Sequence, residues 1–235
     1  MLDSHVHIGQ FREEYYGFER VFEAIFASEK ITQIRYSSTS SCIFDVKYDF
    51  VFKEIETSQK EYTDRATPLF WFVPDYINQG IRIETAMNEL NYGGFKLHPH
   101  GNVWDFENDA KQTDILHEIF DYADKRKMPI LIHTGESGTD RPSRFEDFFG
   151  EYPNAQIILA HCRPAAKTVE MMRKYANVFG DTAFTPKERI DFVKSAGFGE
   201  RLIFGTDFPI THFYSGAKNG ISLKEQYLND LNSHK

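Results

Sequence analysis

Cysteine is scarce in this sequence: only Cys42 and Cys162 occur among 235 residues, and they lie far apart, without zinc-finger spacing. We therefore expect no disulfide framework, and we predict a reducing, cytoplasmic location. The chain also has no apolar run of the roughly 20 residues that a membrane helix needs. Its first residues lack the basic stretch and apolar segment of a signal peptide, so a soluble protein is predicted.

Basic residues are in the minority, because 27 Lys and Arg stand against 35 Asp and Glu and leave a formal net charge of −8. Nucleic acids and anionic membranes both favour clustered Lys and Arg, and no such cluster occurs. Neither a nucleic acid nor a membrane is therefore expected as a partner. We expect a small-molecule substrate instead. No segment specifies an interface, so assembly into a homo-oligomer stays open.

Short apolar segments alternate with longer amphipathic ones from end to end. Strands are expected over Leu2–Ile8, Ile31–Tyr36, Pro68–Val73, Gly94–Leu97, Ile130–His133, Gln156–Ala160, Val178–Asp181 and Leu202–Phe204. Helices are expected over Phe18–Ser28, Tyr48–Tyr62, Ile81–Asn91, Thr113–Lys127, Arg144–Phe149, Ala165–Tyr175, Pro186–Ala196 and Ser222–Asp230. Strand followed by helix, repeated about eight times, is typical of a parallel α/β architecture.

Two closures of such a sheet are open, a doubly wound sheet and a (β/α)₈ TIM barrel. A doubly wound nucleotide binder needs a glycine-rich turn after an early strand, and neither GxGxxG nor GxxxxGK(S/T) occurs. Eight units in 235 residues fit a compact barrel, whose usual size is about 250 residues. We therefore predict a single-domain barrel over residues 1–235, with loops at Ser37–Lys47 and His98–Lys111 on its catalytic face.

Polar side chains fall where these strands end. His5 and His7 alternate with Val6, so both imidazoles project from one face of the first strand and can bind one divalent cation. The carboxyl ends of the strands in a barrel meet at one face, where the active site forms. The other residues expected there are Lys96, His133, His161 and Asp207.

The motifs around these residues resemble those of the amidohydrolase superfamily, and within it the group of aminocarboxymuconate semialdehyde decarboxylase and related TIM-barrel metal-dependent hydrolases. The resemblance covers nearly the whole chain and rests on D-S-H-V-H, G-F-K-L-H-P, I-H-T-G, L-A-H-C and F-G-T-D-F-P. It implies metal binding by His5, His7, His133 and Asp207. It also implies that His161 is a further metal ligand or an acid/base.

The residue types fit that chemistry. A catalytic zinc takes nitrogen and oxygen ligands and keeps an open position for water, whose pKa it lowers to about 7. Asp207 beside that water can accept its proton and pass it to a leaving group. A metal-dependent hydrolase using metal-activated water on an amide, ester or lactone is predicted, with zinc as the expected ion. The alternatives are a metal-dependent decarboxylase on the same site and a non-catalytic metal-binding barrel.

Two cationic residues have open roles. In several branches of the superfamily a lysine at the position of Lys96 is carboxylated and bridges two metals, whereas an unmodified Lys96 would bind a substrate carboxylate. One ion is expected, and two if Lys96 is carboxylated. Arg163 either binds a substrate carboxylate or is a surface residue. His98 and His100 are expected to be loop residues or residues that support the metal ligands, and not ligands themselves.

Overall fold

The structure is a computed structural model that describes residues 1–233, and its strands follow the predicted order. The strands are β1 (Leu2–Phe11), β2 (Glu14–Tyr16), β3 (Gln33–Ser38), β4 (Ala66–Pro68), β5 (Phe70–Trp71), β6 (Phe95–Leu97), β7 (Pro129–His133), β8 (Gln156–Ala160), β9 (Val178–Asp181) and β10 (Leu202–Ile203). They form a four-stranded sheet, β2-β1-β3-β4, and a six-stranded sheet, β10-β9-β8-β7-β6-β5. All these pairings are parallel except that of β1 with β2.

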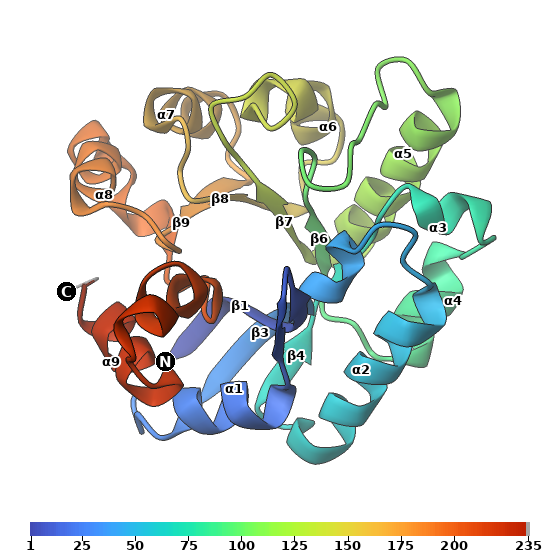
Figure 1. Ribbon diagram of the computed structural model, residues 1–235. Helices are drawn as coiled ribbons and strands as arrows, with labels where there is room; N and C mark the ends of the chain where they lie inside the picture. Colours follow the sequence, from blue (N-terminus) through green and yellow to red (C-terminus); the bar gives the residue numbers. More distant parts are fainter. Residues whose placement is uncertain (234–235) are drawn as a thin grey trace.

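Backbone hydrogen bonds join the two sheets on both sides. Leu69 lies between β4 and β5, and its N–H donates to the carbonyl of Tyr36 in β3 at 2.7 Å. On the other side, the N–H of Ser4 donates to the carbonyl of Phe204 at 3.0 Å, and that of His7 to the carbonyl of Phe208 at 2.7 Å. The strands therefore surround one axis, as predicted for a TIM barrel (Figure 1).

Helices lie outside this ring (Figure 1). They are α1 (Phe18–Phe26), α2 (Tyr48–Tyr62), α3 (Asp75–Asn78), α4 (Ile83–Glu89), α5 (Ala110–Arg126), α6 (Glu146–Glu151), α7 (Ala165–Lys174), α8 (Lys187–Val193) and α9 (Leu223–Ser233). None of these helices combines the length and apolar character that crossing a membrane requires. The sequence prediction missed α3 and the short hairpin strand β2.

Alternation along the strands divides the core into two layers. Ile130 and Ile132 of β7 belong to the large apolar cluster shared with the helices. Leu131, between them, belongs to a smaller cluster with Leu69, Ile158 and Ala160, which fills the inside of the barrel. His133 is the next inward position on β7, so the same alternation that packs the interior also directs His133 toward the barrel mouth.

The loop after β3 begins later than expected. The segment Ser37–Lys47 was predicted to be irregular, but Ser37 and Ser38 complete β3, and Thr39–Cys42 forms a 3₁₀ turn. Gly9 in β1 faces this turn with φ of +91°, a conformation that glycine adopts without strain. The turn therefore packs directly against the strand that carries His5 and His7.

Candidate metal centre and active site

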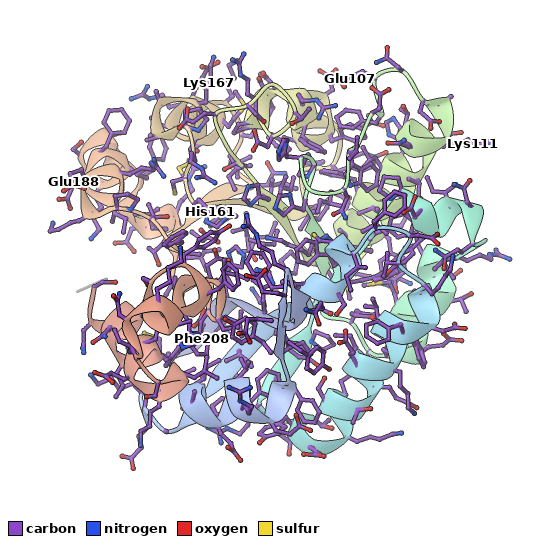
Figure 2. All side chains as sticks on the ribbon, in the orientation of Figure 1. Glu107, Lys111, His161, Lys167, Glu188 and Phe208 are labelled. Atoms are coloured by element: carbon purple, nitrogen blue, oxygen red, sulfur yellow. The ribbon has the colours of Figure 1, made fainter. Side chains whose placement is uncertain are left out.

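The predicted polar residues gather in one cavity at the carboxyl ends of the strands. Its volume is about 360 Å³, and six of the seven predicted site residues line it, while His5 lies beneath them and is 1% exposed. His161, at the end of β8, lies near the centre of the ring (Figure 2). The predicted residues that line the cavity are His7, Lys96, His133, His161, Arg163 and Asp207.

His5, His7 and Asp207 form a compact triangle. Nε2 of His5 lies 3.1 Å from Nε2 of His7, and Oδ1 of Asp207 lies 3.3 Å and 3.2 Å from these two nitrogens. Neighbouring ligand atoms around a tetrahedral zinc at about 2.1 Å are about 3.4 Å apart. The triangle therefore has the spacing of one face of such a coordination shell.

The other ring nitrogens of these histidines determine where their protons lie. Nδ1 of His5 donates to Oδ2 of Asp181 at 2.7 Å, and Nδ1 of His7 donates to the backbone carbonyl of Ser37 at 3.4 Å. A neutral imidazole that donates through Nδ1 carries a lone pair on Nε2. Two nitrogen lone pairs and the Asp207 carboxylate thus face one another, an arrangement that a cation between them stabilises.

Asp181 was not among the predicted site residues. It ends β9 and is buried, and its Oδ1 also accepts the backbone N–H of His161 at 2.7 Å and that of Ala183 at 3.2 Å. Burial raises the pKa of Asp181 to about 6. Its position in the sequence could have identified it, because Asp181 is a carboxylate at the end of the seventh predicted strand and several other predicted strands carry site residues at that end.

His161 and His133 form a neighbouring pair. Nδ1 of His161 donates to the carbonyl of Ala183 at 2.8 Å, which leaves its Nε2 as an acceptor 3.1 Å from Nδ1 of His133. His161, His5 and Asp207 also offer ligand atoms within 4.8 Å of one another. His133 contacts His161 and Asp140, whose Oδ2 lies 3.9 Å from its Nε2. His161 is therefore placed between His133 and the triangle.

Two site residues have strained backbones. His161 has φ of +66° and Asp207 has φ of +64°, in the left-handed region that residues with a Cβ seldom adopt. Such conformations cost about 1–3 kcal/mol and concentrate at functional sites. In the second case the backbone N–H of Asp207 donates to the carbonyl of His5 at 2.8 Å. This contact holds the carboxylate next to the β1 histidines.

Lys96 is buried inside the barrel. Its Nζ lies 3.1 Å from Nε2 of His5 and 5.5 Å from the centre of the Trp71 ring. Burial lowers the pKa of Lys96 to about 8. Burial also raises the pKa of Asp207, but the facing His5, His7 and His161 outweigh this effect and leave that pKa lowered. The site therefore holds an ionised carboxylate beside a lysine that loses its proton readily.

Arg163 lies on the cavity wall. Its Nε donates to the carbonyl of Thr134 at 3.2 Å, and its backbone N–H donates to Oγ1 of the same residue at 3.3 Å. Among residues 1–233 the terminal nitrogens of the guanidinium have no hydrogen-bond partner, so they can bind a ligand. The rest of the wall consists of aromatic side chains from other strands and loops, namely Phe11, Trp71, His98, Phe184 and Tyr214.

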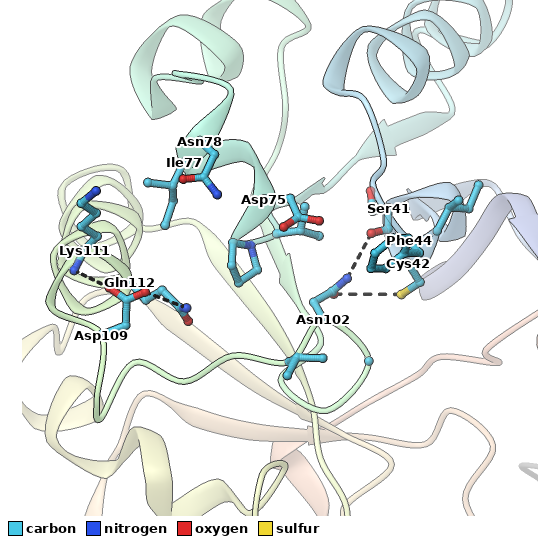
Figure 3. Close-up of a pocket in the computed structure, with 15 residues that line it drawn as sticks. Ser41, Cys42, Phe44, Asp75, Ile77, Asn78, Asn102, Asp109, Lys111 and Gln112 are labelled. Atoms are coloured by element: carbon cyan, nitrogen blue, oxygen red, sulfur yellow. Dashed lines mark hydrogen bonds between the residues drawn. The ribbon is translucent and has the colours of Figure 1, made fainter.

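A second cavity of about 440 Å³ lies beside the first, between the 3₁₀ turn, α3 and the loop before α5 (Figure 3). Cys42, a free cysteine like Cys162, lines both cavities. Asn102 accepts a hydrogen bond from Nε1 of Trp71 at 2.9 Å and donates to the carbonyl of Ser41 at 3.0 Å. Asn102 thus fixes the wall between the cavities.

Comparison with known proteins gives a family match along most of the chain. The family model described as Amidohydrolase matches residues 55–228. No curated protein sequence matches the chain significantly.

Solved structures share the fold. An uncharacterized TIM-barrel protein from Bordetella bronchiseptica is 14% identical, with a TM-score of 0.59 over 99% of this chain and 90% of that one. Dihydroorotase from Campylobacter jejuni is 15% identical, with a TM-score of 0.52 over 97% and 80% of the two chains. A uronate isomerase from Bacillus halodurans is 11% identical, with a TM-score of 0.61 over 92% of this chain and 58% of that one. Likenesses at such identities show the TIM-barrel fold alone.

Proposed function

Because the chain belongs to the amidohydrolase family, we propose that it is a metal-dependent hydrolase that acts through metal-activated water on an amide, ester or lactone of a small molecule. The observation that carries this proposal is the triangle of His5, His7 and Asp207, in which three lone-pair atoms face one another at 3.1–3.3 Å. Each of these atoms can fill one coordination position of a cation placed between them.

The donor set fits a divalent ion. Imidazole nitrogen and carboxylate oxygen are ligands that zinc accepts, and the strands supply them from separate parts of the chain. We propose His5, His7, His133 and Asp207 as ligands of one zinc ion, with His161 as a further ligand or as the acid/base. When bound, the ion would polarise a substrate carbonyl and lower the pKa of a water molecule.

The protein residues then have distinct tasks. Asp207 has a second carboxylate oxygen beyond the one in the triangle, and it can accept a proton from the attacking water and release it to the leaving group. Nε2 of His161, fixed as an acceptor by the bond of Nδ1 to Ala183, can hold a proton during the same exchange. Lys96 and Arg163, both on the cavity wall, bind anionic or carbonyl oxygens of the substrate.

Metal content and turnover test this proposal together. We expect about one zinc per chain by mass spectrometry, and hydrolysis of some members of a panel of small amides, esters and lactones. His5→Ala should lose both metal and activity. His117→Ala, which removes a half-buried histidine on α5 that does not line the cavity, should keep both.

A wild-type chain that bound no divalent metal, with His5→Ala behaving identically, would contradict the proposal. Release of carbon dioxide from small carboxylic acids, without hydrolysis of any panel member, would instead assign a decarboxylase to the same site.

A further inference from the structure

His98 lies in the middle of a stack of three aromatic rings at the cavity wall. It follows β6, and its ring lies between those of Trp71 and His133. The centroid distances are 5.8 Å to Trp71 and 3.8 Å to His133, and the planes are within 7° and 10° of parallel. Both faces of the His98 ring are therefore covered, and only its edges can meet a ligand.

One of those edges is used by the loop that His98 begins. The backbone N–H of Gly101 donates to Nδ1 of His98 at 2.9 Å. A backbone N–H can only donate, so Nδ1 carries no proton, and the single proton of the neutral ring lies on Nε2. Glycine is needed for this approach, because an added Cβ at position 101 would lie 2.9 Å from Nδ1.

The other edge of the ring carries Nε2–H, and His98 is one of the residues that line the cavity. Within residues 1–233, no acceptor meets this N–H. A fixed donor that faces a cavity without an acceptor is placed to bind an oxygen of a ligand.

We propose that His98 is a substrate-binding residue whose Nε2–H donates to a carboxylate or carbonyl oxygen of the substrate. The inference rests on the proposed function and extends it, because it assigns an oxygen acceptor to the substrate at a defined place beside His133. The covering rings of Trp71 and His133 prevent the imidazole from turning, so the donor direction is set before the substrate arrives.

Two amide substitutions separate this role from a structural one. In His98→Asn the amide oxygen falls near the position of Nδ1, so it can still accept the Gly101 N–H but leaves no donor toward the cavity. In His98→Gln the amide nitrogen falls near the position of Nε2, so it can restore the donor. The control is His100→Asn, since His100 is exposed, contacts Oγ1 of Thr139 and does not line the cavity.

Benzoate is a suitable probe, because the cavity combines aromatic rings with Lys96 and Arg163. In nitrogen-15 spectra of the histidine rings, the resonances lost in His98→Asn should show a neutral ring protonated on Nε2, and benzoate should shift them. By calorimetry, His98→Asn should weaken benzoate binding about tenfold, the loss expected for one hydrogen bond to a charged group. His98→Gln should recover most of that loss, and His100→Asn should bind as wild type does.

A ring protonated on Nδ1, or one whose resonances benzoate leaves unmoved, would overturn the proposal. So would a His98→Asn variant that binds benzoate as wild type does, because the donor would then be dispensable. None of these measurements depends on turnover. A chain that bound no zinc and hydrolysed nothing would defeat the proposed function, while the benzoate series would still decide the role of His98.

Discussion

Asp181 holds the imidazole of His5 in one orientation and one tautomer. Its Oδ2 accepts from Nδ1 of His5 at 2.7 Å, so Nε2 faces His7 and Asp207 with its lone pair. Carboxylates in this position raise the basicity of a ligating histidine, and their loss typically lowers metal affinity 10–100-fold. Asp181 therefore belongs to the proposed metal site although it does not face the cavity.

Asp181→Asn should test this role without unfolding the site. The amide oxygen can still accept the backbone N–H groups of His161 and Ala183, but the amide N–H₂ would face Nδ1 of His5. We expect zinc affinity to fall by about 10–100-fold, measured by competition with a chelator. Asp191→Asn, on the exposed face of α8, is the control and should bind zinc as wild type does. Equal affinities for all three proteins would contradict the role.

Gly9 supports the same strand through its backbone. A Cβ there would lie 2.5 Å from Oγ of Ser38 and 2.6 Å from Oγ of Ser40, in addition to the strain of a φ of +91°. Gly80→Ala is the matched control, because Gly80 has φ of +71° and no atom near the added Cβ. We expect Gly80→Ala to cost about 1 kcal/mol and Gly9→Ala clearly more, measured by urea unfolding. Similar losses would mean that the serines move aside freely.

Single residues were predictable where the strand pattern places them. His5, His7, Lys96, His133, His161, Arg163 and Asp207 all reach the site because each stands in or just after a predicted strand. The roles assigned to them stay predictions. The contacts of His98 were not predictable, because they depend on Trp71 and Gly101, whose approach to its ring is set by the loop after β6 and not by a periodic pattern.

For the helices too, the periodic sequence pattern predicts that an element exists, while its exact ends depend on contacts outside the pattern. The helix predicted over Thr113–Lys127 is confirmed as α5, in which Leu116, Ile119 and Phe120 are buried. The helix begins at Ala110, earlier than predicted, because the side chain of Asp109 accepts the N–H of Lys111 and caps it. The break of the third strand at Leu69, between β4 and β5, has no counterpart in the apolar pattern of Pro68–Val73.

The apolar face of α5 is expected to contribute strongly to the stability of the fold. Phe120 is fully buried and stacks on Phe148 of α6, with ring centroids 4.8 Å apart. Phe120→Ala should lower the free energy of unfolding by about 3–5 kcal/mol through the lost contacts and the cavity. Glu118→Ala, on the exposed face of α5, should change it by less than about 0.5 kcal/mol. Urea titrations monitored by circular dichroism measure both values, and a loss below about 1 kcal/mol for Phe120→Ala would contradict this packing.

In the whole molecule, the first strand and the last helix are joined by a buried carboxylate. Oδ2 of Asp3 in β1 accepts from the hydroxyl of Tyr227 in α9 at 2.9 Å and from Oγ1 of Thr206 at 2.7 Å. Burial raises the pKa of Asp3 to about 7. Eight strand–helix units predicted a barrel, but the residues that close it are far apart in sequence and carry no shared motif. The contacts that close the barrel could therefore be identified only in the structure.

α9 also provides the clearest link between pH and the stability of the whole chain. Asp230 accepts from Oγ1 of Thr211 at 2.5 Å and from Nε2 of Gln226 at 2.6 Å, and burial raises its pKa to about 6. Below about pH 4 the carboxyl is protonated in both the folded and the unfolded chain. Between about pH 4 and 6 the folded chain keeps a proton that the unfolded chain has lost, so stability falls as pH rises.

Asp230→Asn removes this titration, because the amide is neutral at every pH. The free energy of unfolding of wild type, relative to that of the variant, should therefore decrease by about 2 kcal/mol between pH 4 and pH 7. Urea titrations at unit steps of pH measure the difference, in which the titration of every other group cancels. The control is Asp121→Asn, whose exposed carboxylate pairs with Lys125, and its difference from wild type should not decrease over this range. A constant offset between wild type and Asp230→Asn would mean that Asp230 titrates alike in the folded and unfolded chains, and so that α9 does not desolvate it.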